Sequence, residues 1–566
     1  MINKYIKKME AYNPPTSGRS NYLRLDFNEN TVGCSPKVLE ALRKITVEDI
    51  AMYPEYENLR KSIADMNKIN VKKIMPTNAG DEGIMFVMNA FLDEKDKVLL
   101  PVPTFAMFKF YAEQAGAEIL EVRYNDDLSF PAEKVLENVQ NAKVVVLVNP
   151  NNPTGTSIKR EDIIRILDKA KNAIVLLDEA YYDFTSNTCM DLVGRYDNLV
   201  ILRSFSKAYG LGGIRVGYLI SDEKNIKIFK KIASPYSITS VASKLVEAAI
   251  KDTDYLKDYV KEVKRCKEYL YTEFSRLGIR FYKGDANFLL ADFSCDYKAV
   301  LGGLKARGIL IRERNSDLKN CLRITVGTLA QGKTLVKALE EILLKVKLDN
   351  VDTLLFDMDG VLIDVSNSYR VAIKKTAELF LKNEISYDEI QAYKDRGGLN
   401  NDWDCVQAIL NDNDILIDRE IIIAEFDRIY LGGAIDDEKL IVTKNLLENL
   451  SKRYKLGIVT GRPKRDADYT IDKYGLRRYF SAIITLDDVS IGKPDPEGIR
   501  KAMDLLRTKD AAYFGDTVDD IDAGKKADIL PVGVLPPLSS SNTSKRLLDS
   551  GAAIVLENIN RLGEVI

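Results

Sequence analysis

Short β-type runs alternate with longer helical patterns along almost the whole chain, and this alternation constrains the fold more than any other feature. In the first part KVLLPV, VVVLVNP, AIVLLDEA, NLVILRSFS and VGYLIS follow one another with helical segments between them. The second part continues with YKLGIVTGR, SAIITLDDV, AAYFGDTVDD and LPVGVLPP. Strands separated by helices form α/β units on a largely parallel sheet. We therefore expect an α/β fold class throughout.

The chain should contain more than one domain, because 566 residues are too many for a single hydrophobic core. The polar stretch LLKVKLDNVD follows a helical pattern and precedes the strand-like run TLLFDMDGVLID. This change predicts a boundary near Lys347, with one domain over residues 1–347 and a second over 348–566. From about 364 to 440 the pattern is helical with few strands, which predicts a cap inserted into the second α/β core.

The composition narrows the chemistry. The chain has no histidine, so serine–histidine or cysteine–histidine catalysis and imidazole metal ligands are excluded. Acid–base work must fall to Lys, Asp, Glu, Tyr or Cys. The six cysteines include no CxxC pair, which argues against a zinc site or a disulfide framework. The net charge of -2 gives no reason to expect nucleic acid or an anionic membrane as a partner, and we expect a cytoplasmic protein.

Three polar loops in the first domain each follow a strand-like run. NPNNPTG (149–155) follows VVVLV, DEAYY (178–182) follows AIVLL, and SFSKAYGLGGIR (204–215) follows NLVILR. Loops at the carboxyl ends of strands converge on the ligand crevice of an α/β sheet. We therefore expect Asn152, Asp178 and Lys207 to meet there.

The residue types in these loops suit pyridoxal phosphate. A lysine can form a Schiff base with a carbonyl cofactor, and a carboxylate keeps the pyridine nitrogen protonated. The cofactor phosphate needs hydroxyls, an arginine and the N-terminus of a helix. Each motif alone also fits a solvated loop, so the prediction depends on their order together. The predicted cofactor residues are Lys207, Asp178, Asn152 and Tyr181 for the ring, Phe105 for stacking, and Gly80, Asp81, Glu82, Ser204, Ser206 and Arg215 for the phosphate.

With these motifs, residues 1–347 resemble the fold-type I pyridoxal-phosphate aminotransferases, nearest the histidinol-phosphate aminotransferase branch. The resemblance also rests on LDFNENTVGCSP (25–36), YPEYENLRKSIA (53–64), NAGDEGI (78–84), PTF (103–105) and CLRITVGT (321–328). It implies a large α/β domain with a small domain, Lys207 as the Schiff-base lysine, and Arg323 as the grip on a substrate carboxylate. Tyr12 and Arg312 would lie near the substrate. Tyr53 would reach the cofactor phosphate of a neighbouring subunit, which implies a homodimer.

Two positions and one segment depart from the usual family pattern. Phe105 stands where tyrosine is common, and Gly80 stands where serine or alanine is common. The first segment, AYNPPTSGR, differs from the usual family version. The side chain of the substrate therefore stays open.

Polar loops, three of them acidic, follow strand-like runs in the second domain. They lie in FDMDGVLID, IVTGR, IGKPDPEGI and YFGDTVDDIDAG. Loop carboxylates can share a hard cation, and a carboxylate can accept a phosphoryl group. Phosphoryl transfer also needs groups that neutralise the phosphate. The residues that supply these parts are Asp357, Asp359, Thr460, Lys493, Asp516 and Asp520.

In this order the motifs resemble the haloacid dehalogenase superfamily over residues 351–566, which implies a Rossmann-like domain with a helical cap. The resemblance makes Asp357 the nucleophile and Asp359 the general acid–base, with Thr460 and Lys493 holding the phosphoryl group. Magnesium would be bound by Asp357, Asp516 and the main-chain carbonyl of Asp359, with Asp520 as outer support. An aspartate at position 359 favours a phosphatase over a dehalogenase.

One segment of the cap has two interpretations. RGGLNNDWD (396–404) is similar to a substrate-selecting cap loop, in which Asn400, Asn401 and Trp403 would contact the substrate. A turn followed by the start of a helix explains the same residues equally well.

Together the two resemblances imply a bifunctional enzyme of histidine biosynthesis that acts on small molecules. The first domain would transaminate a substrate of the histidinol-phosphate type with glutamate and 2-oxoglutarate, and the second would hydrolyse a phosphate monoester. Another amino-alcohol phosphate, such as serinol phosphate, is an alternative product. Decarboxylation that yields ethanolamine phosphate is another, because it would use the same lysine and Asp178. One half could instead be a degenerate regulatory module, although its motifs are intact.

Overall fold

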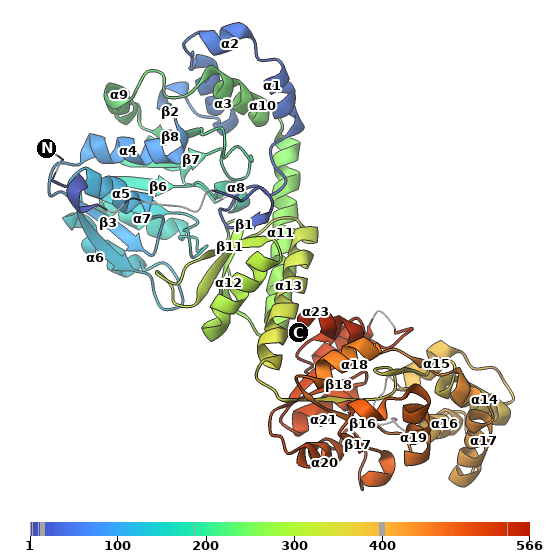
Figure 1. Cartoon of the computed structure of the whole chain (residues 1–566). Coiled ribbons are helices and arrows are strands. Elements are labelled where there is room, and N and C mark those ends of the chain that lie inside the picture. The colour runs from blue at the N-terminus through green and yellow to red at the C-terminus, as the bar shows by residue number, and fades with distance from the viewer. Residues whose placement is uncertain are drawn as a thin grey trace. The chain divides into compact units, whose positions relative to one another are not determined.

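The computed structural model describes residues 2, 4–9, 11, 17–185, 187–394, 402–539 and 542–566. The chain forms two compact units, Met1–Leu339 and Glu340–Ile566 (Figure 1). Strands alternate with helices in both units, which confirms the predicted α/β fold class. Within the described ranges, no helix combines the length and apolar character needed to cross a bilayer.

The first unit is built on a seven-stranded sheet. All its strands run parallel except β8, which is antiparallel to β2 and to β7. In spatial order the strands are β2 (Ile74–Thr77), β8 (Gly217–Ser221), β7 (Leu199–Ser204), β6 (Ile174–Asp178), β5 (Val144–Val148), β3 (Lys97–Val102) and β4 (Glu118–Arg123).

Strand β5 shows why the apolar run VVVLV folds as a central strand. Val145 and Leu147 pack into one core cluster, together with side chains of α3 and α7. Val144 and Val146 pack into a second cluster, together with side chains of α4, α5 and α9. Successive side chains of a strand point to opposite faces, so a sheet covered on both sides needs a continuous apolar run. These helices are α3 (Glu57–Asn67), α4 (Ala79–Phe91), α5 (Met107–Gln114), α7 (Arg160–Lys169) and α9 (Glu223–Ile232).

A five-stranded sheet completes the first unit. Its order is β1 (Leu23–Leu25), β11 (Ile309–Glu313), β12 (Cys321–Thr325), β10 (Phe288–Asp292) and β9 (Arg280–Tyr282). Strand β1 pairs in parallel with β11, which joins the N-terminal part of the unit to its C-terminal part. Arg312 and Arg323 face one another as register partners on β11 and β12. Helices α11 (Thr253–Arg276) and α12 (Tyr297–Ala306) belong to the same part of the chain.

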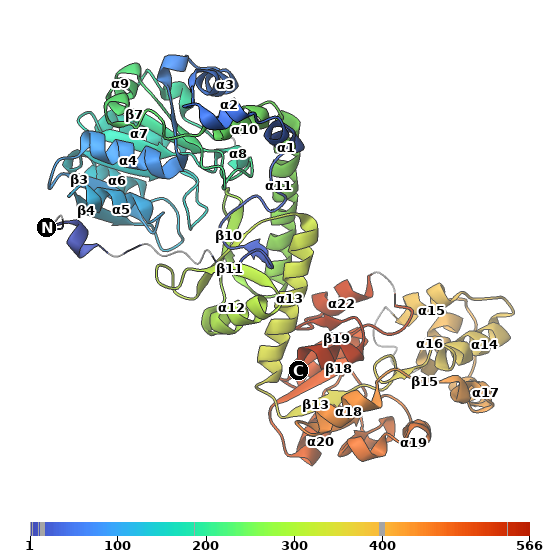
Figure 2. The same ribbon diagram turned by 45° about the horizontal axis from the view of Figure 1, so that its top comes forward.

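The second unit contains a six-stranded sheet in which all strands are parallel. Their order is β17 (Ala482–Ile484), β16 (Lys455–Val459), β13 (Thr353–Phe356), β18 (Ala511–Gly515), β19 (Leu530–Val534) and β20 (Val555–Leu556). Within this unit, four helices group away from the sheet and share a core of their own (Figure 2). They are α14 (Tyr369–Leu381), α15 (Tyr387–Lys394), α16 (Asp402–Asn411) and α17 (Arg419–Leu431).

Two short strands lie where the chain passes between this helical group and the sheet. β14 (Ile363–Asp364) and β15 (Lys439–Leu440) pair antiparallel. The predicted cap range of 364–440 begins and ends in these strands. We call the helical group between them the cap, and Glu438–Leu440 the second cap linker.

Helix α13 (Leu329–Leu348) contains both the division between the units and the predicted boundary near Lys347. Its residues Leu344 and Leu348 are buried in the core cluster of the second unit, beside strand residues such as Leu354. The change from one core to the next therefore occurs inside a helix. The sequence pattern shows only where that helix ends.

Candidate functional sites

Most of the predicted cofactor residues line one cavity in the first unit. It lies where β5, β6 and β7 end, at the carboxyl edge of the large sheet. The predicted residues that line it are Gly80, Asp81, Phe105, Asn152, Asp178, Tyr181, Ser204, Ser206, Lys207 and Arg215.

Lys207 and Asp178, the predicted Schiff-base lysine and ring-nitrogen carboxylate, both line this cavity. Lys207 follows β7, and its Nζ donates to the carbonyl oxygen of Phe27 at 3.1 Å. Asp178 is the last residue of β6 and only 6% exposed. Burial raises the pKa of its carboxyl to about 7. A hydrogen bond from the Ala180 N–H and the charge of Lys207 lower this pKa, but their effect is smaller than that of burial. A buried carboxylate of this kind suits a cationic ring nitrogen as its partner.

The residues around Tyr181 include one that the sequence analysis missed. Asn28 is buried, and its Nδ2 donates to the Tyr181 hydroxyl at 2.9 Å. The Thr325 hydroxyl donates to Asn28 Oδ1 at 3.3 Å, so β12 holds this amide in place. Asn28 lies in the quoted LDFNEN segment, but no local pattern distinguishes it from Asn30 two residues later.

The N-terminal end of α4 also lines the cavity, through Gly80 and Asp81. Arg215 donates to Asp81 at 2.7 Å, which joins the loop after β7 to the first turn of this helix. Ser204 and Ser206 lie on the same loop, and the Ser206 N–H donates to the Ser204 hydroxyl at 3.1 Å. N–H groups, hydroxyls and a guanidinium are the groups that a phosphate needs.

The other predicted residues of the first unit do not line the cavity. Glu82 accepts from the Asn78 N–H and the Ser237 hydroxyl. Arg323 is buried and donates to Asn152 Oδ1 at 2.5 Å, so it touches a residue of the wall. Arg312 lies 5.7 Å from the centre of the Phe27 ring. Tyr53 is exposed and stacks on Tyr236, whereas Tyr12 lies outside the described residues.

The raised pKa of Asp178 predicts a pH-dependent loss of stability in the cofactor-free protein. A carboxyl whose pKa is higher in the folded state than its unfolded value of about 3.9 makes folding less favourable as pH rises from about 4 to about 7. Asp178→Asn removes this titration. We therefore expect the cofactor-free variant to gain up to about 4 kcal/mol over the parent across that range.

Urea unfolding of the cofactor-free proteins at several pH values measures this difference. Asp197→Asn, which neutralises an exposed carboxylate, is the control and should follow the parent. A difference between Asp178→Asn and the parent that does not change with pH would contradict the prediction.

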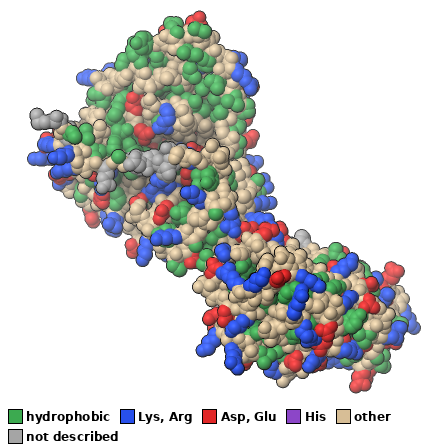
Figure 3. All heavy atoms as spheres, in the orientation of Figure 1, with side chains coloured by type: hydrophobic (Ala, Val, Ile, Leu, Met, Phe, Trp, Pro, Cys, Tyr) green, Lys and Arg blue, Asp and Glu red, His purple; other side chains and the backbone are tan. Residues whose placement is uncertain are grey.

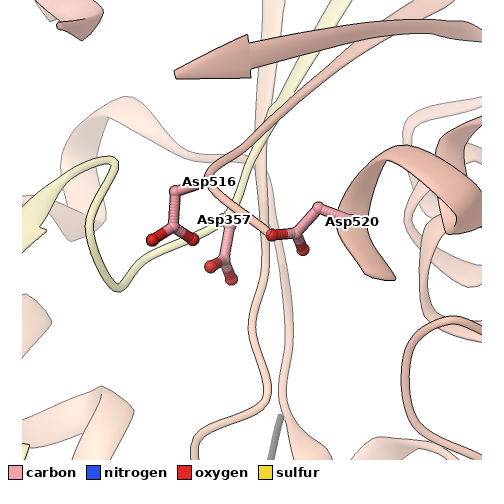
Figure 4. Close-up of side chains that lie close together, drawn as sticks. All are labelled: Asp357, Asp516 and Asp520. Atoms are coloured by element: carbon pink, nitrogen blue, oxygen red, sulfur yellow. The ribbon is translucent and has the colours of Figure 1, made fainter. Parts of the chain in front are cut away.

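Three carboxylates gather at the carboxyl edge of the sheet in the second unit (Figure 4). Oxygen atoms of Asp357, Asp516 and Asp520 lie within 4.8 Å of one another. Gly360 allows the loop after β13 to approach Asp516, because a Cβ at this position would lie 2.2 Å from Asp516 Oδ2. Its φ of +71° also favours glycine. Such a set of oxygen ligands suits a hard divalent cation.

Lys493 joins two of these carboxylates. Its Nζ donates to Asp357 Oδ1 at 2.8 Å and to Asp520 Oδ1 at 2.6 Å. Burial opposes its charge, but the two carboxylates raise the pKa of Lys493. Asp520 also accepts from the N–H and hydroxyl of Thr517, which caps α21 (Val518–Lys526). Because all these donors hold Asp520, this residue suits an outer support for Lys493 better than a direct metal ligand.

Asp357 is a buried member of this carboxylate cluster. Burial raises its pKa, Lys493 lowers it, and the neighbouring charges of Asp520 and Asp359 raise it further. A divalent cation here would compensate this crowding of negative charge. The donor set therefore fits Mg²⁺.

Asp359 is held by a residue that the sequence analysis missed. Arg462 donates through Nε to Asp359 Oδ1 at 2.7 Å. The N–H of Arg462 also donates to the hydroxyl of Thr460 at 3.2 Å, and Thr460 itself does not line the cavity. Arg462 belongs to the TGR segment directly after β16, so its position beside Thr460 was the available signal.

The second cavity extends from the carboxylates toward the cap. Trp403, Tyr369 and Phe426 line its cap side, together with the charged residues Asp364 and Arg370. Of the three predicted cap residues, Trp403 therefore borders the cavity. Asn400 and Asn401 lie outside the described residues.

Comparison with known proteins finds a family match in each unit. The family model for aminotransferase class I and II matches residues 20–339, and the model for haloacid dehalogenase-like hydrolase matches residues 351–528. The histidinol-phosphate aminotransferase of Thermoanaerobacter pseudethanolicus is 37% identical over 330 residues, which are 57% of this chain and 93% of that relative.

Solved structures resemble the first unit. Histidinol-phosphate aminotransferase from Sinorhizobium meliloti in complex with pyridoxal-5'-phosphate matches with a TM-score of 0.57 and 25% identity, over 61% of this chain and 98% of that one. L-threonine-O-3-phosphate decarboxylase from Porphyromonas gingivalis has a TM-score of 0.52 and 23% identity, over 57% and 99%, and shows likeness of fold alone. Both predicted resemblances are confirmed. The chain belongs to the aminotransferase class I and II family, and its residues 351–528 match the haloacid dehalogenase-like hydrolase family.

Proposed function

We propose that the first unit transaminates a phosphorylated substrate of the histidinol-phosphate type, and that the second unit hydrolyses a phosphate monoester with Mg²⁺. The observation that supports this most strongly is the pairing of two chemically complete sites in one chain. Lys207 and Asp178 share one cavity, and Asp357 lies with Lys493 at the other. Intact reactive groups in both units argue against a degenerate regulatory half.

In the first reaction, the chain's own residues would hold the cofactor and move a proton. Pyridoxal phosphate, when bound, supplies an aldehyde and an electron sink. Lys207 would hold that aldehyde and then carry the proton at the substrate α-carbon. Asp178 would hold the proton on the ring nitrogen, and Tyr181 and Asn152 would contact the ring hydroxyl. Ser204, Ser206, Arg215 and the start of α4 would bind the phosphate.

Two arginines support an anionic substrate. Arg312 and Arg323 are register partners on adjacent antiparallel strands, so their side chains start from the same face of the sheet. Like charges placed opposite each other destabilise a sheet unless an anion joins them. Arg323 also contacts Asn152 of the cavity wall. These residues would bind the carboxylate of glutamate and the phosphate of the second substrate.

In the second reaction, Asp357 would attack the phosphorus while Lys493 neutralises the phosphoryl oxygens. Mg²⁺ would be held by Asp357, Asp516 and the main-chain carbonyl of Asp359, and it would neutralise charge as the phosphoryl group moves. Asp359 would donate a proton to the leaving oxygen. It would then remove a proton from the water that releases the phosphate.

A substrate screen tests the proposal. The holoenzyme is incubated with glutamate and phosphorylated ketones, and then with phosphorylated amino alcohols and Mg²⁺, while amine transfer and phosphate release are both measured. We expect imidazole acetol phosphate to be the best amine acceptor, and histidinol phosphate to be the best substrate for phosphate release. A preference for serinol phosphate, or carbon dioxide release from phosphoserine, would instead support one of the alternative activities.

We also propose a homodimer formed through the first unit. An exposed apolar surface, which we call the α1–α2 surface, lies on α1 (Pro36–Arg43), α2 (Val47–Ala51) and the residues after them. Hydrophobic side chains gather over this end of the first unit (Figure 3). An apolar patch of this kind marks a protein interface. Its members are Leu39, Leu42, Val47, Ile50, Met52 and Tyr53.

Ile50→Asp should dissociate this dimer. Ile50 is 74% exposed in the single chain, and burying one isoleucine contributes about 2 kcal/mol. A two-fold interface contains the change twice, so dimer affinity should fall by about 1,000-fold or more. Analytical ultracentrifugation measures the loss, with Leu416→Asp at an exposed cap position as the control. A variant that stays as dimeric as its parent would rule out this surface.

A further inference from the structure

Arg462 is a fully buried arginine that lies between two carboxylates. On one side it contacts Asp359, with Nε at 2.7 Å and Nη2 at 2.5 Å from the same oxygen. On the other side it contacts Glu438, with Nη1 at 3.1 Å and Nη2 at 3.0 Å from the two oxygens. Asp359 belongs to the loop after β13, and Glu438 belongs to the second cap linker.

Residues of the cap and of the sheet domain enclose this arginine. Tyr430 of α17 donates its hydroxyl proton to Glu438 Oε1 at 2.8 Å. Tyr369 of α14 places its ring 4.9 Å from the Arg462 guanidinium carbon. Thr470 of α19 (Lys464–Tyr474) accepts from Arg462 Nη1 at 2.9 Å and donates to Glu438 Oε2 at 2.8 Å. The guanidinium therefore contacts Asp359 and one residue from each of two cap helices, Tyr369 of α14 and Tyr430 of α17.

The asymmetry of exposure indicates what this arrangement holds in place. The side chains of Arg462 and Glu438 are 0% exposed, whereas that of Asp359 is 31% exposed and lines the cavity. Glu438 is the fully buried carboxylate that compensates the buried charge of Arg462, and Asp359 favours that charge as well. The contacts to Asp359 fix the direction of its carboxyl, which lines the cavity, whereas the carboxyl of Glu438 is wholly enclosed.

We propose that Arg462 is a positioning residue that aims the carboxyl of Asp359 at the leaving oxygen, and that Glu438 of the second cap linker sets the position of Arg462. This inference rests on the phosphatase activity proposed above. It makes proton transfer depend on the placement of the cap linker, because displacement of Glu438 displaces the arginine that holds Asp359.

The step that depends on this alignment is the first half of the reaction. A bond forms between an oxygen of Asp357 and phosphorus while the bond from phosphorus to the ester oxygen breaks. The proton of Asp359 passes to that oxygen, which leaves as an alcohol. In the second half, water attacks phosphorus, its proton returns to Asp359, and the bond between Asp357 and phosphorus breaks.

Two esters of similar size separate positioning from general damage. Benzyl phosphate must release an alkoxide, which needs the proton of Asp359, whereas 4-nitrophenyl phosphate releases a stable phenolate. With Arg462→Gln in the full-length protein, kcat/KM for benzyl phosphate should fall by about 100-fold. The value for the nitrophenyl ester should fall by less than about 5-fold, and Arg462→Lys should recover part of the loss.

Further variants keep the outcome interpretable. Arg462→Gln/Glu438→Gln leaves no uncompensated buried charge and replaces the single variant if that one does not fold. Introduced into Asp359→Asn, Arg462→Gln should have little further effect on benzyl phosphate, because the group that it aims is already lost. Arg477→Gln, at an exposed arginine of the same unit, is the control and should match the parent.

Equal losses for the two esters, or additive effects in the Asp359→Asn background, would overturn the positioning role. If the parent protein hydrolysed neither ester, the proposed phosphatase activity itself would fail instead. The two failures are therefore distinguishable.

Discussion

Replacement of Lys207 by alanine should abolish amine transfer, with a loss of at least about 10,000-fold. The reason is that one ε-amine would both hold the cofactor aldehyde and carry the α-proton, and proton transfer alone contributes about 100- to 10,000-fold. Phosphate release by the second unit should be unchanged, because Lys207 belongs to a separate compact unit. A coupled assay for 2-oxoglutarate formed from glutamate measures the first effect.

A matched variant checks the interpretation of this result. Lys224→Ala removes an exposed lysine of the same unit, ion-paired with Asp197, and should transaminate like the parent. Added methylamine should restore part of the activity to Lys207→Ala, because a small amine can enter the cavity and carry the proton. If Lys207→Ala transaminates at the parental rate, the assignment of the first site is wrong.

Asp357→Asn should remove phosphate release to a similar extent, because an amide oxygen is a poor nucleophile and a weaker magnesium ligand than a carboxylate. Amine transfer should not change. The fold should also survive, since Lys493 keeps its contact of 2.6 Å with Asp520. Release of inorganic phosphate from 4-nitrophenyl phosphate in the presence of Mg²⁺ measures the loss.

Two controls accompany this variant. Asp522→Asn changes a partly exposed carboxylate on α21 and should leave phosphate release intact. Chelation of Mg²⁺ should abolish phosphate release by the parent protein and leave its amine transfer unchanged. The reason is that the cluster of Asp357, Asp516 and Asp520 belongs to the second unit. Phosphate release by Asp357→Asn at the parental rate would exclude Asp357 as the nucleophile.

The loops that carry the chemistry were predictable because parallel strands deliver their carboxyl ends to one edge of a sheet. Asn152, Asp178 and Lys207 each follow an apolar run, and the structure brings them to one cavity. Asp357 and Asp516 follow strands β13 and β18, which are neighbours in the second sheet. In these cases, local sequence patterns sufficed because strand position and loop position are coupled.

Asn28, Glu438 and Arg462 were not predicted, because their importance arises from contacts between distant parts of the chain. Asn28 meets Tyr181 across 153 positions, and Arg462 meets Asp359 across 103. A buried arginine beside two carboxylates looks, in the sequence, like any charged residue after a strand. Burial and partner identity become visible only when the strands are packed.

The amino-acid sequence by itself determined the α/β class, the motif order and the family of each unit, since apolar periodicity and strand-end loops are local properties. The tertiary structure decided which carboxylates Lys493 joins, how Arg462 connects Asp359 to the second cap linker, and where one core gives way to the next inside α13. These features depend on long-range packing, because desolvation and ion pairing are set by neighbours that chain order does not specify.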